Sequence, residues 1–465
     1  MICLTSNYYK KYFDFDAFNI LEKKYDVTYL LNKKNFNLKI PQKKKFVYYK
    51  TTDFSDIKYM RFIHLSMIVN KNKSKTFRYQ FRRWYPNFED FFLQSVQNNF
   101  ETKKYRNIFF FILFTIINYL RKPLFRRLRI KFLSFQLIFN FYKKNIIDKY
   151  PIDLNIYSVI KKINPDLILY PSHCFEPETI KLTKISKKIG SKIIFIIDNW
   201  DNLSSKTVFL ENPDAITVWG KQSAIHANKI HKIKKKNIFL LGSPKFDYYF
   251  KIKNNKFKKI FNFDYVLFLG ILQPYNEIAA LKVIDIEISS NPKLYKNLKL
   301  VYRPHPGREY LINKAYREKF KNIIFDPRMK NYVISRNKNF LVSNKNYYES
   351  LISNSLFMVG GLTTVVLESV IFNKKYLFLA YPEKYNLTDP KKMYENYTHY
   401  NEISKISYLS KCCDINDLSK DFRNLFRNHY QNKKNIISEL SYFYNISKTG
   451  YSQKLYNITK KVLTN

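Results

Sequence analysis

Residues 167–241 contain four short apolar runs: LILY at Leu167–Tyr170, KIIFII at Lys192–Ile197, AITVW at Ala215–Trp219 and IFLL at Ile238–Leu241. Segments of helical length, such as Glu178–Ile189 and Lys221–His231, lie between them. Short apolar strands that alternate with helices are typical of parallel βαβ units covered by helices on both faces. This stretch therefore predicts a doubly wound α/β domain.

The same alternation extends in both directions. At the amino end, Ile2–Thr5 and Val27–Leu31 read as strands, and Phe13–Lys24 has apolar residues at helical spacing. Beyond the basic segment Lys251–Lys259, the pattern begins again with the apolar run Tyr265–Leu269. The elements expected after it are the strands Leu298–Tyr302, Asn339–Val342, Leu356–Val359 and Tyr376–Ala380, and the helices Tyr275–Ile288, Tyr347–Ser353, Thr363–Phe372, Ile415–Tyr430 and Lys433–Val462.

The pattern predicts two Rossmann-like domains that face each other across a crevice. Residues 1–250 form the first, expected to hold an acceptor, and residues 251–465 form the second, a nucleotide-donor domain that ends in C-terminal helices. A length of 465 residues fits this division, because domains usually span about 100–200 residues. Doubly wound sheets bind ligands at the carboxyl ends of their strands, so the site is expected in the crevice.

Composition excludes several classes of protein. With 46% hydrophobic and 25% charged residues the chain can bury large cores, which excludes global disorder, and Gly 8 and Pro 16 exclude a collagen-like chain. The net charge of +46 favours anionic partners, either nucleic acid, acidic lipid or phosphorylated substrates, without choosing among them. The four cysteines form no C-x-x-C pair and no disulfide framework, which fits a reducing compartment.

Residues 32–150 carry no clear α/β pattern and are expected to form a membrane-contacting insertion. The apolar run Ile108–Leu120 has 13 residues, fewer than the ~20 that a spanning helix needs. From Lys103 to Lys131 there are nine Lys and Arg residues and no acidic residue, as in a helix that lies on an anionic membrane surface. The alternative is a buried helix with solvated ends. Because the amino terminus has no signal-peptide pattern, we expect a cytoplasmic protein, peripheral on the inner face of the membrane.

The segment Leu356–Glu368 (LFMVGGLTTVVLE) predicts a phosphate site. Gly360 and Gly361 allow a tight turn after a strand, and Thr363 and Thr364 then begin a helix whose free N–H groups and dipole attract anions. Glu368 follows one helical turn later, where its carboxylate can reach a ribose hydroxyl. The alternative is a capping turn in which Thr363 caps the helix and Glu368 is solvated.

The segment Val301–Gly307 (VYRPHPG) also follows a strand. Two prolines bracket His305 and fix the backbone, so its imidazole is expected to point rigidly toward the crevice. His305 can donate to one phosphate oxygen and Arg303 can pair with another. The alternative is a purely structural histidine.

Polar residues crowd the end of a third strand, at Ile197–Lys206 (IDNWDNLSSK). Asp198 and Asp201 are candidates for the base that deprotonates an acceptor hydroxyl, and Trp200 offers a stacking face for a sugar. Asn199 and Asn202 are further acceptor contacts; the alternative is an Asx-rich turn that caps the next helix.

Two other polar residues follow strands, His173 and Glu277, and both are candidates for the mouth of the crevice. For His173 the structural alternative is the favoured one. The histidines at 226 and 231 are not spaced as ligands on one helical face, and the chain has neither a P-loop nor an H-E-x-x-H motif. We therefore expect no metal and no cofactor.

The strand-end motifs resemble those of the GT-B glycosyltransferases that build bacterial surface polysaccharides. The resemblance covers residues 160–385, and the most similar group holds the Kdo and polysialic acid transferases and the CDP-glycerol glycerophosphotransferases. It implies that His305, Thr363 and Thr364 hold the donor phosphate, with Thr-Thr in place of the more usual Ser-Ser. The segments around Asp198–Lys206, Val218–Ser223 and Gly242–Asp247 are similar to surface-carbohydrate proteins grouped with these enzymes.

The expected function is transfer of a sugar or glycerol phosphate from a nucleotide-activated donor to a surface polysaccharide or lipid-linked acceptor. UDP-N-acetylglucosamine 2-epimerases share the two-domain fold and a Gly-Gly phosphate turn, so an epimerase is the alternative. A nucleic-acid-binding protein, suggested by the charge alone, is third, because no aromatic-basic RNA motif is present. The motifs leave open the donor nucleotide, the acceptor, the linkage, the stereochemical outcome and the oligomeric state.

Overall fold

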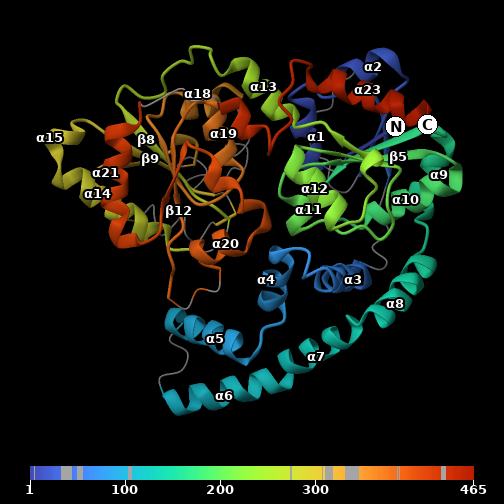
Figure 1. Ribbon diagram of the computed structural model, residues 1–465, viewed down its shortest axis with the longest axis horizontal. Helices are drawn as coiled ribbons and strands as arrows, with labels where there is room; N and C mark the ends of the chain where they lie inside the picture. The colour runs from blue at the N-terminus through green and yellow to red at the C-terminus, as the bar shows by residue number, and fades with distance from the viewer. Residues whose placement is uncertain are drawn as a thin grey trace.

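The computed structural model describes residues 1–4, 6–32, 44–49, 56–102, 107–272, 275–305, 307–308, 318–329, 345–384, 386, 388–430 and 436–464. Within these residues the chain forms two parallel β-sheets, each flanked by helices and lying side by side (Figure 1). The predicted α/β class with two Rossmann-like halves is confirmed by this topology.

The first sheet has the strand order β3-β2-β1-β4-β5-β6-β7, and all of its described pairings are parallel. Its central strands β4 and β5 are buried almost throughout, which explains their continuous apolar sequence. The strands are β1 Ile2–Leu4, β2 Thr28–Asn32, β3 Lys45–Tyr49, β4 Leu167–Ser172, β5 Lys192–Ile197, β6 Ala215–Val218 and β7 Ile238–Leu240.

The second sheet has the order β10-β9-β8-β11-β12-β13, again with parallel pairings. The edge strands β3, β10 and β13 were not predicted: β10 has only three residues, Ser410 and Lys411 interrupt β13, and β3 (KFVYY) is apolar but only partly buried. The predicted strand at Asn339–Val342 lies outside the described residues. The strands are β8 Tyr265–Leu269, β9 Lys299–Arg303, β10 Ile323–Phe325, β11 Met358–Gly360, β12 Tyr376–Leu379 and β13 Leu409–Cys412.

Helices cover both sheets. The expected helix over Phe13–Lys24 is instead two helices, and the turn between them contains Asp16 in the left-handed region (φ 52°). The helices of the first half are α1 Ser6–Phe13, α2 Asn19–Lys24, α9 Leu154–Ile163, α10 Glu178–Ile189, α11 Asn202–Ser205, α12 Lys221–Lys229 and α13 Pro244–Ile252. Those that follow are α14 Glu277–Ser290, α15 Pro292–Tyr295, α18 Lys345–Ser353, α19 Val365–Ile371, α20 Pro390–Asn396, α21 Leu418–Asn428, α22 Ile436–Leu440 and α23 Tyr451–Thr464.

The last helix, α23, belongs to the first half. Tyr451, Leu455, Ile458 and Val462 share a buried cluster with Ile2 and other residues around the first sheet. Both chain ends therefore lie beside one another (Figure 1). The expectation that all C-terminal helices belong to the second domain is wrong for α23, because its buried side chains pack with those around the first sheet.

Residues 56–149 form an insertion of six helices below the two halves (Figure 1). Helices α3 and α4 share a buried cluster with residues of the first half. The other four make an extended arm, and α6 to α8 run along its outer side. The helices are α3 Asp56–Val69, α4 Lys75–Trp84, α5 Phe88–Thr102, α6 Ile108–Arg121, α7 Pro123–Leu133 and α8 Gln136–Lys149.

Helix α6 is not the buried helix that one interpretation of its sequence expected. Its buried residues are Phe111, Thr115 and Tyr119, whereas Ile108 is 75% exposed and Phe109 66% exposed. Within the described residues one helical stretch, 108–133, is long and apolar enough to cross a membrane by length and composition. The stretch has 26 residues and exceeds the 13-residue apolar run, because it continues into α7.

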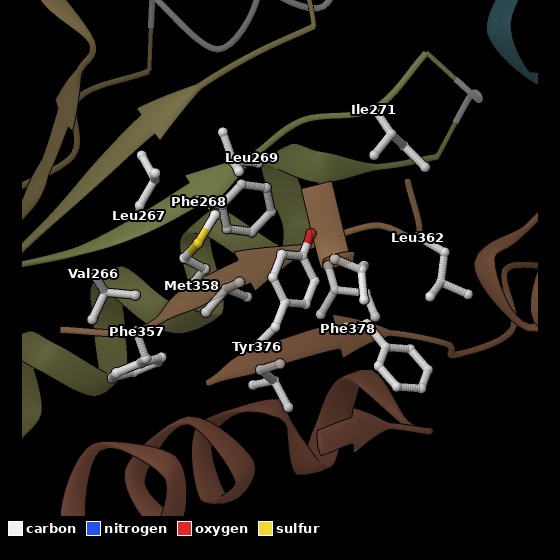
Figure 2. Close-up of a cluster of buried hydrophobic side chains, with 14 of the residues drawn as sticks. Val266, Leu267, Phe268, Leu269, Ile271, Phe357, Met358, Leu362, Tyr376 and Phe378 are labelled. Carbon is white, nitrogen blue, oxygen red and sulfur yellow. The ribbon is translucent and has the colours of Figure 1, made fainter. Parts of the chain in front are cut away.

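The core of the second half fixes the strand ends that approach the first half. Side chains of β8 and β12, among them Phe268, Tyr376 and Phe378, pack around β11 (Figure 2). A Cβ on Gly360 would lie 2.2 Å from the carbonyl oxygen of Leu269, so only glycine lets β11 end this close to β8.

Candidate active site

A cavity of about 370 Å³ lies between the two halves. One side is formed by α1, α13 and the segments that follow β5 and β6, and the other by α18 and α19. The carboxyl ends of strands from both sheets therefore reach the same space. The lining residues are Lys11, Asp14, Phe15, Asn199, Trp219, Ser243, Lys245, Phe246, Tyr249, Tyr348, Glu349, Thr364 and Glu368.

A larger cavity of about 720 Å³ lies at the opposite, amino edge of the first sheet, where Met1, Thr28 and Asp166 line it. Ligands of doubly wound sheets bind at the carboxyl edge, at the point where the strand order reverses. We therefore assign the candidate site to the smaller cavity between the halves.

Thr364 joins the two halves across this cavity. Its hydroxyl oxygen accepts a hydrogen bond from Asn199 Nδ2 at 3.1 Å and from Trp200 Nε1 at 3.3 Å. The segment after β5 and the segment after β11, two of the predicted motifs, thus meet directly. In this arrangement the Thr364 hydroxyl is engaged by the first half.

Glu368 is also engaged by the first half. One carboxylate oxygen lies 2.6 Å from Lys245 Nζ of α13, and the other accepts from the hydroxyl of Tyr348 at 3.0 Å. The Glu368 side chain is only 4% exposed, so the alternative of a solvated Glu368 is wrong. Lys245 also sits over the rings of Tyr249 and Tyr348, 5.1 Å from each centroid. A ribose hydroxyl would have to share Glu368 with this lysine.

The Gly-Gly-x-Thr-Thr turn is shaped by packing. Gly361, like Gly360, has no room for a side chain, because a Cβ would lie 2.5 Å from Ile271. The hydroxyl of Thr363 accepts from the backbone N–H of Val365 at 3.2 Å, but the N-cap of α19 is Thr364, whose side chain makes no cap hydrogen bond. Close packing therefore explains why glycine is needed at both positions, and no bound ligand is required for this explanation.

Arg303, like His305, is not among the residues that line the cavity. Its guanidinium forms an ion pair with the buried carboxylate of Asp326 and lies over the ring of Tyr348, 5.6 Å from the centroid. The predicted second phosphate contact would therefore require Arg303 to be shared with Asp326.

His305 has a defined tautomer. Its Nδ1 accepts a hydrogen bond from the backbone N–H of Gly307 at 3.0 Å, so the ring proton is on Nε2. Burial, helped by the nearby charge of Arg308, lowers the pKa of His305 below its ordinary value of 6.5. At neutral pH His305 is therefore a neutral imidazole with one N–H to donate. Of the two bracketing prolines, Pro306 lies outside the described residues.

The strand register places His305 and the glycine turn at the same edge. Leu269 pairs with Arg303 on one side and with Gly360 on the other. Strands in a sheet are about 4.8 Å apart, so the ends of β9 and β11 are separated by about 10 Å. Groups after these two strands can therefore contact different parts of one extended ligand.

His173 belongs to a polar cluster at the carboxyl end of β4. Its Nδ1 contacts the hydroxyl of Tyr8 and lies 3.2 Å from the carboxylate of Glu176, which also accepts from Ser172 at 2.6 Å. Burial would raise the pKa of Glu176, but hydrogen bonds from His173 and Ser172 outweigh it and lower the pKa to about 2. The His173 side chain is 35% exposed.

Asp198, on the adjacent strand end, pairs with Lys11. The lysine Nζ lies 2.8 Å and 2.9 Å from the two carboxylate oxygens, and the Asp198 side chain is 8% exposed. Lys11 lines the cavity, so this ion pair stands at its wall.

Three predicted residues of the same motif do not face an acceptor. Trp200 is 1% exposed and packs against His399 and Phe443, so it cannot stack on a sugar. Asn202 is fully buried at the start of α11. Asp201 accepts from Ser205 at 3.2 Å, and the charges of Lys206 and His399 overcome the effect of burial and lower its pKa. A carboxylate with a lowered pKa is a weak base, so the prediction for Asp201 is not supported by its surroundings.

Glu277 was expected at the mouth of the crevice, and this prediction is wrong. It is fully buried, lies 2.9 Å from Arg308, and accepts from the hydroxyl of Tyr302 and from the backbone N–H of Ile271. Its role is to hold the segment after β8 against the end of β9.

Sequence reasoning missed Lys11, Lys245, Tyr348, Tyr8 and Glu176. Lys245 follows β7 closely and could have been found by the rule that located the other motifs. Lys11 and Tyr348 lie within helices, where no local pattern marks them. Among the residues that the structure describes, no group of three or more His, Cys, Asp and Glu is placed to hold a metal ion.

No protein-family model matches the sequence, and no curated protein matches it. Three solved structures show the extent of the likeness in fold. The chain is 13% identical to UDP-GlcNAc 2-epimerase from Methanocaldococcus jannaschii, with 69% of this chain and 82% of that chain covered and a TM-score of 0.44. The chain is 14% identical to S. aureus MnaA, solved with UDP, with 69% of this chain and 79% of that chain covered and a TM-score of 0.44. It is 12% identical to the wall teichoic acid polymerase TagF, with 64% of this chain and 72% of that chain covered and a TM-score of 0.39.

Proposed function

We propose that the protein is a transferase that moves a sugar, or glycerol phosphate, from a nucleotide-activated donor to a surface-glycan or lipid-linked acceptor. The observation that carries the proposal is the cavity between two opposed parallel sheets, lined by residues at the carboxyl ends of strands from both halves. Such a cavity suits a reaction that brings two substrates together, one held by each sheet.

The second half would bind the donor. The neutral His305 offers an N–H to a phosphate oxygen, and the separation of about 10 Å between the ends of β9 and β11 suits a nucleotide diphosphate that extends between them. A donor near Thr364 and Glu368 would compete with their contacts to Asn199 and Lys245. Lys245 would then be available to the developing phosphate charge.

The first half would activate the acceptor, and we propose His173 as the candidate base; it lies at the carboxyl end of β4 and is not among the residues that line the cavity. With its proton on Nδ1, facing Glu176 and the hydroxyl of Tyr8, the His173 ring would hold its lone pair on Nε2. In the transfer, Nε2 takes the proton of the acceptor hydroxyl as its oxygen bonds to the transferred group, and the nucleotide leaves with the electron pair of the broken bond. Asp198, which is 8% exposed, is the second candidate for the base.

Nucleotide binding followed by product analysis tests this function. Calorimetry with CMP, CDP, UDP and GDP would identify the nucleotide, and the matching activated donor is then incubated with and without a glycan or lipid-linked acceptor. We expect product only when the acceptor is present. Conversion of the sugar of UDP-N-acetylglucosamine without any acceptor would show that the protein is a 2-epimerase and not a transferase. If none of the nucleotides binds, both functions are rejected.

A further inference from the structure

We propose that the outer face of the arm, formed by α6, α7 and α8, lies flat on an anionic phospholipid membrane. The inference does not depend on the reaction at the site, because it rests on side chains of the insertion alone. The arm runs below both halves (Figure 1), so a membrane in contact with it would face the whole molecule.

The first observation is the apolar surface of α6. Its buried stripe, Phe111 and Tyr119 with Thr115 between them, faces α5, where Phe92 and Phe88 contact the two rings. The remaining faces of α6 are exposed and strongly apolar. The exposed apolar residues are Ile108, Phe109, Phe110, Ile112, Leu113, Phe114, Ile116, Ile117 and Leu120, each between 38% and 75% exposed.

The apolar surface continues beyond α6. In α7, Phe125, Leu128 and Phe132 are more than half exposed and are spaced to share one face of the helix. Leu137 and Phe141 of α8 are 84% and 73% exposed. An apolar surface that extends over three consecutive helices is much larger than the scattered apolar residues of ordinary protein surfaces.

The second observation is the charge that borders this surface. Residues 107–149 contain nine Lys and Arg residues and one acidic residue, Asp148. Arg126 and Arg127 are engaged by α4, since they lie over the rings of Tyr85 and Phe81. In α6 and α7, and at the break between them, the exposed basic residues without such a ring contact are Arg121, Lys122, Arg129 and Lys131. Apolar side chains bordered by basic ones match the acyl chains and the anionic headgroups of a lipid surface.

These charges favour a membrane surface over other occupants. A crossing of the bilayer by residues 108–133 would place Arg121, Lys122 and four more basic residues within or beside the hydrocarbon. The helix is also interrupted at Lys122, directly before Pro123. A second copy of the chain would bring two strongly basic arms together, which is repulsive.

Vesicle flotation with the full-length chain tests the proposal. We expect it to float with phosphatidylcholine vesicles that contain phosphatidylglycerol, and to float much less with phosphatidylcholine alone or at high salt. Replacing Arg121, Lys122, Arg129 and Lys131 by Gln should weaken binding by on the order of 10² to 10³-fold. The matched control replaces Lys234, Lys235, Lys236 and Lys293, which are exposed elsewhere, and should bind like the unmodified protein.

A second variant tests the apolar contribution. Phe109, Phe110 and Phe114 are exposed, so their replacement by Ser should leave the folded core intact, as circular dichroism would show, while flotation is lost. Equal binding of the charge variant and its control, or equal binding to neutral vesicles, would overturn the proposal. Resistance to alkaline carbonate would show a spanning helix instead, and sedimentation that depends on protein concentration without lipid would show self-association.

Discussion

Asn199 Nδ2 lies 3.1 Å from the hydroxyl oxygen of Thr364, although the two residues belong to different halves of the molecule. Each follows a parallel strand, so the contact brings the carboxyl edge of β5 to that of β11. The candidate site therefore depends on how the two halves meet. The four predictions that follow test the contacts in and around this meeting point.

Replacing Thr364 by Val keeps the shape of the side chain and removes its hydrogen bonds to Asn199 and Trp200. We expect a loss of about 1 kcal/mol in the free energy of unfolding, measured in urea. Thr364→Ser retains the hydroxyl and should behave like the unmodified protein. Equal stability of all three proteins would show that this contact does not hold the halves together.

Substitutions of Lys245 and Glu368, which form an ion pair, are predicted to have non-additive effects on stability. Lys245→Met leaves the carboxylate of Glu368, which is 4% exposed, without its cation, and should cost on the order of 2 kcal/mol of stability. Adding Glu368→Gln removes the orphaned charge, so the double variant should be more stable than Lys245→Met alone. A double-mutant cycle from thermal or urea unfolding measures the coupling, and purely additive effects would contradict it.

His305 is predicted to act in catalysis as a neutral donor. Its pKa is lowered by burial and by Arg308, so the active neutral form persists from neutral pH to below pH 6.5, and activity should fall only in more acidic solution. His305→Ala should reduce turnover by about 10²-fold or more with little change in stability. The pH profile of the rate decides: a profile that rises as the pH falls through 6 would require the protonated imidazole instead.

Glu176 is predicted to make the free energy of unfolding depend on pH in the acidic range. Its pKa of about 2 in the folded protein lies below its ordinary value of 4.5, so the ionised carboxylate stabilises the native state at neutral pH. That contribution, roughly 3 kcal/mol, is present above pH 4.5 and is lost as the pH falls from there through 2. Glu176→Gln should be less stable at pH 7 and should lose less on acidification. Parallel urea titrations at several pH values provide the comparison.

The fold could be predicted where strands are buried on both faces. The runs KIIFII and YVLFL belong to central strands, whose two faces both contact helices, so every position except Lys192 at the start of the first run is apolar. The edge strands β10 and β13 leave no such run, because β10 (IIF) has only three residues and Ser410 and Lys411 interrupt β13. The prediction placed α23 in the wrong half. Its apolar stripe shows that one face of the helix is buried, but the stripe does not identify the sheet on which that face packs.

The site could be predicted only as a set of strand ends. Sequence located Thr364, Asn199 and His305 at the right edges, because parallel strands of one sheet end together. It could not reveal that Trp200 is covered by His399, nearly two hundred residues further along the chain. Lys245 and Glu368 are likewise 123 residues apart, and the sequence around either residue does not indicate that the two form an ion pair. Burial and pairing were set by long-range packing.

The return of α23 to the first sheet determines how the two halves can move. The chain passes from one half to the other twice, after α13 and again before α23, and the two passages touch: Tyr444 packs on Phe246 with 5.3 Å between ring centroids. Two covalent connections side by side act as a double hinge and oppose twisting of one half against the other. We therefore expect any opening of the cavity to be a rotation about these two adjacent connections rather than a twist.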